Sequence, residues 1–149
     1  MRSRTLFAIA LPAALLLGCS DSTRPDTVIT ETRTYVLESV DGHTLPYNVS
    51  TDTAITFVAE SGSLVLTPPN VAIVTSVSLV GPTDSATADT LISPLQYEIH
   101  GDSIEVGGFG SCDPCFPNQH GKISDSTVTI TASSFANAQG LLYRRVMSQ

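Results

Sequence analysis

The sequence has no tryptophan, few aromatic residues and few basic ones, and its hydrophobic runs are short. Seven lysine and arginine residues stand against fourteen aspartate and glutamate residues, so the formal net charge is −7. Phosphate binding depends on lysine and arginine displacing counterions, and attraction to anionic lipid depends on clustered cations. The composition therefore argues against a nucleic-acid-binding protein and against a protein held on a membrane by its own charge.

The N-terminal region has the three parts of a bacterial secretion signal. Arg2 and Arg4 precede an apolar stretch over residues 6–17, and Cys19 follows where cleavage is expected. The stretch is shorter than the roughly 20 residues that span a bilayer, and Pro12 interrupts it. A permanent membrane helix is therefore the weaker interpretation.

The cleavage site, Leu16-Leu17-Gly18-Cys19, resembles the lipobox of bacterial lipoproteins. The resemblance implies that residues 1–18 are removed and that Cys19 becomes a lipid-modified N-terminus, which several acyl chains would anchor stably. Ser20 resembles the pattern that sorts lipoproteins to the outer membrane, so we expect a lipid-anchored envelope protein facing the periplasm. The alternative is an ordinary secreted protein with a chance cysteine.

Removal of residues 1–18 leaves five basic side chains and all fourteen acidic ones. Residues 19–30 are small and polar with one proline, which is typical of a flexible tether between a lipid and a domain. We expect the folded domain to occupy residues 31–149. That length suits one domain with one hydrophobic core.

From residue 31 the chain is a succession of short segments rich in valine, isoleucine and threonine, separated by glycine, proline, aspartate and asparagine. No segment has helical periodicity. In residues 71–80 the apolar side chains alternate with Ser76 and Ser78, which predicts a half-buried strand. The same alternation predicts the inward-facing side chains of two further strands, Ile55, Phe57 and Ala59 in residues 53–59 and Leu95, Tyr97 and Ile99 in residues 95–100.

Further strands are expected in residues 35–40, which end at the turn dipeptide Asp41-Gly42, and in 64–66, 94–108 (a hairpin), 128–132 and 141–146. The spacing predicts an all-β fold, an antiparallel up-and-down barrel of about eight strands, with a β-sandwich as the alternative. The longest loops are expected at residues 81–91 and 109–121.

The order of these segments is similar to that of small bacterial envelope lipoproteins with lipocalin-like, or calycin-like, barrels. The matching pieces are residues 35–42 followed by Leu45-Pro46, the hairpin residues 96–104, and residues 142–145. The resemblance implies a closed or nearly closed barrel without enzymatic activity. The Gly-x-Trp of true lipocalins is absent, and Pro68-Pro69 stands where relatives tend to have an Asp-Gly turn.

Two cysteines remain after Cys19, and they stand close together in Cys112-Asp113-Pro114-Cys115. In an oxidising envelope such a pair is expected to form a disulfide, and the short loop between them gives little stabilisation. A redox-active pair is the alternative, but it needs a helix N-terminus or a cation beside the thiol, and Asp113 adds the opposite charge. His120 could be a third metal ligand, yet structural zinc requires four, so no metal site is expected.

No residue is predicted to be catalytic. Glu98 and Glu105 are expected to face solvent, which does not suit a glycosidase pair, and His43 and His100 are expected at the surface. The residues 107–110 are glycine-rich but lack the lysine of a phosphate loop. We therefore expect a barrel without a cofactor that binds a small apolar molecule, with a structural or protein-interaction module or a thiol–disulfide module as alternatives.

Overall fold

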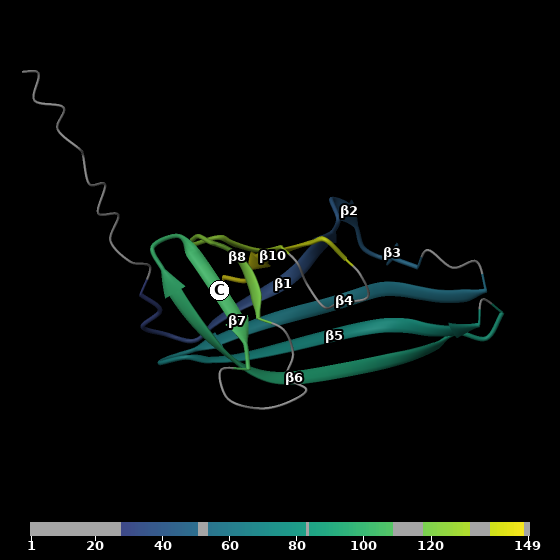
Figure 1. Cartoon of the computed structure of the whole chain (residues 1–149), viewed down its shortest axis with the longest axis horizontal. Coiled ribbons are helices and arrows are strands. Elements are labelled where there is room, and N and C mark those ends of the chain that lie inside the picture. The colour runs from purple at the N-terminus through teal and green to yellow at the C-terminus, as the bar shows by residue number, and fades with distance from the viewer. Residues whose placement is uncertain (1–27, 51–53, 83, 109–117, 132–137, 148–149) are drawn as a thin grey trace, which may run out of the picture.

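A computed structural model describes residues 28–50, 54–82, 84–108, 118–131 and 138–147. Every regular element in these residues is a β-strand (Figure 1). The strands are β1 (Arg33–Val40), β2 (His43–Thr44), β3 (Tyr47–Asn48), β4 (Ile55–Thr67), β5 (Val71–Pro82), β6 (Thr87–His100), β7 (Ser103–Gly107), β8 (Gln119–Ile123), β9 (Thr127–Thr131) and β10 (Gly140–Arg145).

The strands form one closed antiparallel barrel. From β4 to β10 each strand pairs with the next along the chain, and β1 closes the ring by pairing with both β10 and β4. Eight strands make the ring, while the two-residue strands β2 and β3 extend it beside β1 and β4. The predicted up-and-down barrel is confirmed, and the β-sandwich alternative is wrong.

The core lies inside the ring and takes buried apolar side chains from all eight of its strands. On β7 and β9 the inward positions are apolar and alternate with polar outward ones, as a half-exposed antiparallel strand requires. Full burial of one such side chain contributes about 1.5–3 kcal/mol. The largest fully buried side chains are Tyr35, Leu64, Leu66, Ile104, Val40, Val106 and Val128.

Three strands, β4, β5 and β6, are much longer than the others and extend past the barrel as a sheet (Figure 1). β1 pairs with β4 only over Ser63–Leu66, and β7 pairs with β6 only from Gln96 onward. The loop predicted at residues 81–91 is therefore wrong, since β5 runs to Pro82 and β6 begins at Thr87. Strand β8 likewise occupies part of the loop predicted at 109–121.

Strand β4 joins two segments that the sequence presented as separate strands, residues 53–59 and 64–66. An irregular register between Ala59 and Ser61 lies at their junction, and such a bulge interrupts the alternation from which strands are predicted. Ala59 is buried as predicted, but Ile55 is exposed. In residues 95–100, Tyr97 is buried and Leu95 and Ile99 pack against the core, as predicted.

The buried face of β5 is the reverse of the face that its apolar alternation favours. Ser76 and Ser78 are each 7% exposed, whereas Ile73 is 37% exposed. The cause is the pairing with β4, because residues directly opposite each other in an antiparallel pair share a face. Leu66 points into the barrel and lies opposite Ala72, so the even-numbered residues of β5 also point inward.

Candidate functional site

Two buried tyrosines and one half-buried arginine lie at one end of the barrel, the end at which β1 begins and β4, β6 and β10 finish. Arg33 and Tyr35 come from β1, and Tyr97 comes from β6, with β4 and β5 between them in the ring. Arg33 and Tyr35 occupy alternate positions of one strand, so they point to the same side. We call this set the Arg33 cluster and this part of the molecule the Arg33 end.

The Arg33 cluster contains polar atoms without hydrogen-bonding partners. Arg33 Nε, Tyr35 Oη and Tyr97 Oη are buried and form no hydrogen bond with any described residue. Tyr35 is 0% exposed and Tyr97 is 4% exposed. The Arg33 side chain is 12% exposed, and its Nη1 lies 3.4 Å from Asp125 Oδ1 in the β8–β9 turn.

The pKa of Tyr97 depends on its burial and on the two other residues of the cluster. Burial raises the pKa of Tyr97 above 10.0, the positive charge of Arg33 lowers it, and Tyr35 raises it further. The net direction is upward, so Tyr97 keeps its proton at neutral pH. Its hydroxyl is therefore available there as a hydrogen-bond donor.

Leaving one buried polar group unpaired costs about 1–3 kcal/mol. Buried polar groups in native proteins nearly always have partners, and an exception calls for an explanation such as a catalytic role or an unseen water or ion. The Arg33 cluster thus places two tyrosine hydroxyls and a guanidinium N–H without partners at one end of the barrel. Such a set of donors suits an oxygen-bearing group of a small molecule.

A depression of about 410 Å³ lies beside the cluster, where the chain ahead of β1 passes the β4–β5 turn and the end of β6. Tyr97 lines it, together with the apolar residues Val28, Ile29, Pro69 and Ile99. The backbone N–H of Tyr97 donates to the carbonyl oxygen of Asn70 at 2.9 Å, which holds this wall in place. The depression therefore presents apolar surface next to Tyr97.

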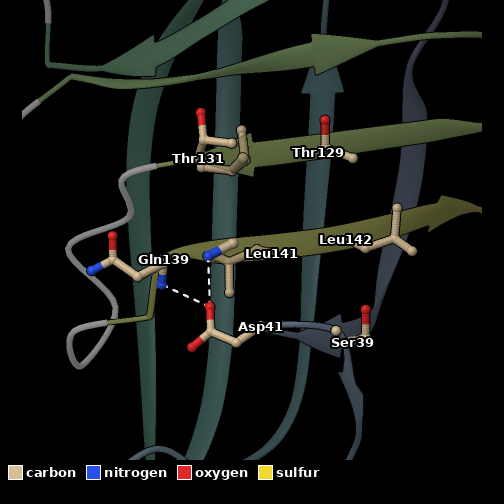
Figure 2. A pocket seen from close by; sticks show the side chains of 10 residues that line it. Ser39, Asp41, Thr129, Thr131, Gln139, Leu141 and Leu142 are labelled. Carbon is tan, nitrogen blue, oxygen red and sulfur yellow. Dashed lines mark hydrogen bonds between the residues drawn. The ribbon is translucent and has the colours of Figure 1, made fainter.

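A second depression, of about 640 Å³, lies on the outer side of β1, β9 and β10 (Figure 2). Ser39, Thr129 and Leu142 line it from strand positions that alternate with buried ones. Its charged residue, Asp41, accepts hydrogen bonds from the backbone N–H groups of Gln139 and Gly140, each at 2.7 Å. The Asp41 carboxylate therefore already has hydrogen-bonding partners, unlike the polar atoms of the Arg33 cluster.

The sequence-predicted cysteines, Cys19, Cys112 and Cys115, lie outside the described residues. His43 is exposed and stacks on Tyr47 with ring centroids 4.4 Å apart. Among the described residues no group of three or more histidine, cysteine, aspartate or glutamate side chains is arranged to hold a metal ion.

The predicted surface residues of the β6–β7 hairpin lie together on the outer face of the barrel. Glu98 and Glu105 are directly opposite each other. His100 Nε2 lies 3.6 Å from Glu98 Oε2, and His120 Nδ1 lies 3.7 Å from Glu105 Oε2. Both histidines are well exposed, so these pairs contribute little to stability.

Sequence reasoning did not identify the Arg33 cluster. The sequence pattern places Tyr35 at the start of a strand and Tyr97 on an inward face, and it presents Arg33 only as one of the basic residues. One feature of the sequence could have indicated the cluster. Arg33 stands two positions before Tyr35, and a strand places residues two positions apart on the same face. The placement of Tyr97 at the same end could not be inferred, because it depends on the pairings of β1 with β4, β4 with β5 and β5 with β6.

The geometry defines a class of protein: a closed eight-stranded antiparallel β-barrel with a polar cluster buried at one end. Comparison of the chain with protein-family models, with curated proteins and with solved structures gives no match. The described residues include no helix long and apolar enough to cross a membrane.

Proposed function

We propose that this chain is a bacterial lipoprotein, anchored through lipid on Cys19, whose barrel binds a small, mostly apolar molecule at the Arg33 end without catalysing a reaction. The anchor is supported by the charged start, the short apolar stretch and the lipobox-like residues ahead of Cys19. The binding role is supported by the Arg33 cluster.

One observation carries the binding role: three buried polar side-chain atoms at the Arg33 end have no hydrogen-bonding partner among the described residues. A bound molecule with a polar end would satisfy them and would stabilise the folded state by mass action. The neighbouring depression, lined by Val28 and Ile29, would hold its apolar part.

The packing limits how large such a molecule can be. An eight-stranded barrel can hold one small ligand or be filled by its own side chains. Here Leu37, Leu64, Val106 and Val128 fill the interior, so a ligand would occupy the Arg33 end rather than run through the barrel.

Native mass spectrometry of the full mature protein, purified from bacterial membranes in a mild detergent, tests the binding role. We expect an extra small-molecule mass that is lost on denaturation. Val28→Trp, which would fill the depression from an exposed position, should reduce the bound fraction, while Ile92→Trp on the outer face of β6 should not. A protein that carries only its N-terminal lipid, and that gains no mass when octan-1-ol or octanoate is added, would show this role to be wrong.

The anchor has its own test. Cys19→Ala should prevent lipid attachment, so that the protein is no longer recovered with the membrane fraction as a lipidated mature chain. Cys112→Ser changes a cysteine that is not part of the lipobox and should leave membrane recovery unchanged. Equal membrane recovery and equal mass for the Cys19→Ala chain would contradict the anchor.

A second candidate function, an interaction module, is favoured by the outer face of the long sheet. Residues 61–83 contain no charged residue, and the pairing of β4 with β5 and β6 places several apolar side chains on the outer face: Val58, Val65, Ile73, Val77, Leu79 and Ile92. In the described part of the chain, β6 pairs on one side only from Thr87 to Leu95. Such a free strand edge can accept another strand.

The partner that fits this edge is a second copy of the chain. Two β6 strands could pair antiparallel with their two Leu91 residues opposite each other. Asp89 would then lie opposite Ser93, so the two aspartates would not face each other. The apolar outer faces of the two sheets would form one continuous surface. Sedimentation of the lipidated protein should then show dimers that Ile92→Lys weakens and Met147→Lys does not. A monomer at all concentrations would contradict the module.

A further inference from the structure

Three separate features of the chain coincide at the Arg33 end: the point where the N-terminal segment joins the barrel, the most exposed apolar side chains and the basic side chains. We infer that this end rests on the membrane surface, with Val28, Val146 and Met147 against the lipid. The long sheet of β4, β5 and β6 then extends away from the membrane (Figure 1). This inference rests on the proposed anchor at Cys19 and adds an orientation to it.

The length of the N-terminal segment limits which part of the barrel can reach the membrane. Val28 follows Cys19 by nine residues, so the chain between them spans at most about 32 Å. Val28 lies beside Pro69, just after the end of β4. Strand β4 has 13 residues, which at the rise of a β-strand extend over roughly 40 Å. The barrel therefore cannot stand on the far tip of the long sheet, at Ile55, because Val28 would then be out of reach of the lipid on Cys19.

The most exposed apolar side chains lie beside the same segment. Met147 is 77% exposed and Val28 is 68% exposed, the highest values among the large hydrophobic residues of the described chain. Val146 is also exposed, and its backbone N–H donates to the carbonyl oxygen of Thr34 at 2.9 Å, which holds the last described residues against the start of β1. Single apolar residues are common on protein surfaces, but a group of them beside a lipid anchor offers the bilayer apolar area to cover.

The charges of the chain favour the same orientation. Residues 34–121 contain no lysine or arginine, so the part of the long sheet that extends past the barrel carries acids, Glu60, Asp84 and Asp89, and no base. At the Arg33 end each basic side chain pairs with a carboxylate: Arg33 with Asp125, Lys122 with Asp102, and Arg145 with Glu31.

A membrane that contains anionic lipid repels acidic groups near its surface. Contact through the outer face of the long sheet would bring the acids of that sheet close to the lipid, whereas contact through the Arg33 end keeps them away. The lipid on Cys19 supplies the affinity for the membrane, and the distribution of charge selects the end of the barrel that faces it.

Tryptophan fluorescence tests the orientation, because the chain has no tryptophan of its own. Met147→Trp, Ile92→Trp and Ile55→Trp each place one reporter at a position that is more than half exposed, at the Arg33 end, on the outer face of β6 and at the far tip. Each full mature protein, with its lipid, is reconstituted into vesicles of phosphatidylethanolamine, phosphatidylglycerol and brominated phosphatidylcholine, whose acyl chains quench a tryptophan that touches them. Met147→Trp should lose fluorescence relative to vesicles without bromine, and the other two variants should not.

A second substitution added to Met147→Trp tests whether apolar contact holds this end on the lipid. Val28→Glu should reduce the quenching, because a carboxylate at this position opposes burial in the bilayer. Ile92→Glu is the matched control, since Ile92 is 62% exposed against 68% for Val28 but lies on the outer face of β6. It should leave the quenching unchanged. Equal quenching with and without Val28→Glu would overturn the proposed contact.

Flotation of the vesicles separates failure of this inference from failure of the anchor. Protein that floats with the vesicles while Met147→Trp is not quenched would overturn the orientation and leave the anchor standing. Quenching of Ile92→Trp or Ile55→Trp would show that another surface faces the lipid and would also overturn the orientation. A mature wild-type protein that does not float with the vesicles would overturn the anchor and the orientation together.

Discussion

Asp41 and Gly140 are joined by two hydrogen bonds that run in opposite directions. The backbone N–H of Asp41 donates to the carbonyl oxygen of Gly140 at 2.7 Å. The Asp41 Oδ1 atom accepts a hydrogen bond from the backbone N–H of Gly140 at 2.7 Å, drawn as one of the two dashed lines that leave Asp41 in Figure 2. Asp41 holds a left-handed backbone conformation with φ of 51°, which aspartate tolerates better than most residues. The pair fastens the turn after β1 to the start of β10.

Asp41→Ala should therefore destabilise the barrel. It removes the acceptor for two backbone N–H groups, and alanine is strained at this φ, so we expect a loss of roughly 1–2 kcal/mol, reduced by solvent exposure. Asp41→Asn keeps an acceptor and tolerates the conformation, so it should lose less. Urea unfolding followed by circular dichroism measures both, and equal midpoints for wild type and Asp41→Ala would contradict the role of this turn.

Tyr35→Phe should stabilise the ligand-free protein, although it changes a fully buried residue. Its hydroxyl is buried without a partner among the described residues, and removing such a group recovers about 1 kcal/mol or more of the desolvation cost. Tyr47→Phe changes a partly exposed tyrosine and should alter the melting temperature little. A lower melting temperature for Tyr35→Phe would mean that its hydroxyl is already satisfied in the ligand-free protein.

Gly121→Ala should be among the most damaging small substitutions. A Cβ at position 121 would overlap the backbone carbonyl oxygen of Thr129 on β9, and backbone cannot move aside as a flexible side chain can. We expect a loss of roughly 1–3 kcal/mol, as for other overpacked sites. Gly108→Ala is the control, since a Cβ there would meet nothing within 4 Å. Similar unfolding midpoints for the two variants would contradict the close approach of β8 and β9.

Alkaline pH should destabilise the fold through Tyr97 and Tyr143. Burial raises the pKa of both above the ordinary 10.0. Below pH 10 these tyrosines are protonated in the folded and the unfolded chain alike. Above pH 10 the unfolded chain loses protons that the folded chain retains, so stability falls by up to about 1.4 kcal/mol per pH unit for each tyrosine.

Denaturant unfolding between pH 9 and pH 12 checks this dependence. Tyr143→Phe should reduce the slope of stability against pH above pH 10, because one proton fewer is then retained by the folded chain. An unchanged slope in Tyr143→Phe would show that the alkaline loss comes from other groups.

The inward face of a strand was predicted correctly where the apolar alternation of that strand agreed with its pairing to the neighbouring strands. Ile104 and Val106 alternate with Glu105, the adjoining turn is Gly101-Asp102, and the structure contains the expected hairpin. The prediction failed on β5, where the exposed Ile73 and the buried Ser76 reverse the expected orientation. A single strand shows which residues share a face, but only its partner determines which face is inside.

The Arg33 cluster also depends on strand pairing and not on the pattern of a single strand. Arg33 lies two positions before Tyr35 and outside the strand predicted at residues 35–40, and the placement of both at the same end as Tyr97 depends on three strand pairings that span residues 33–97. No local pattern encodes such a contact.

By itself the sequence determined the all-β class, the antiparallel meander and several turns, because alternation and turn residues act over a few neighbouring positions. It also carries the signal for the predicted anchor at Cys19. Only the tertiary structure decided the length of β4, β5 and β6, the inward face of β5 and the placement of Arg33, Tyr35 and Tyr97 at the same end of the barrel. These features depend on register and ring closure, which join residues far apart in the chain and set the burial of each side chain.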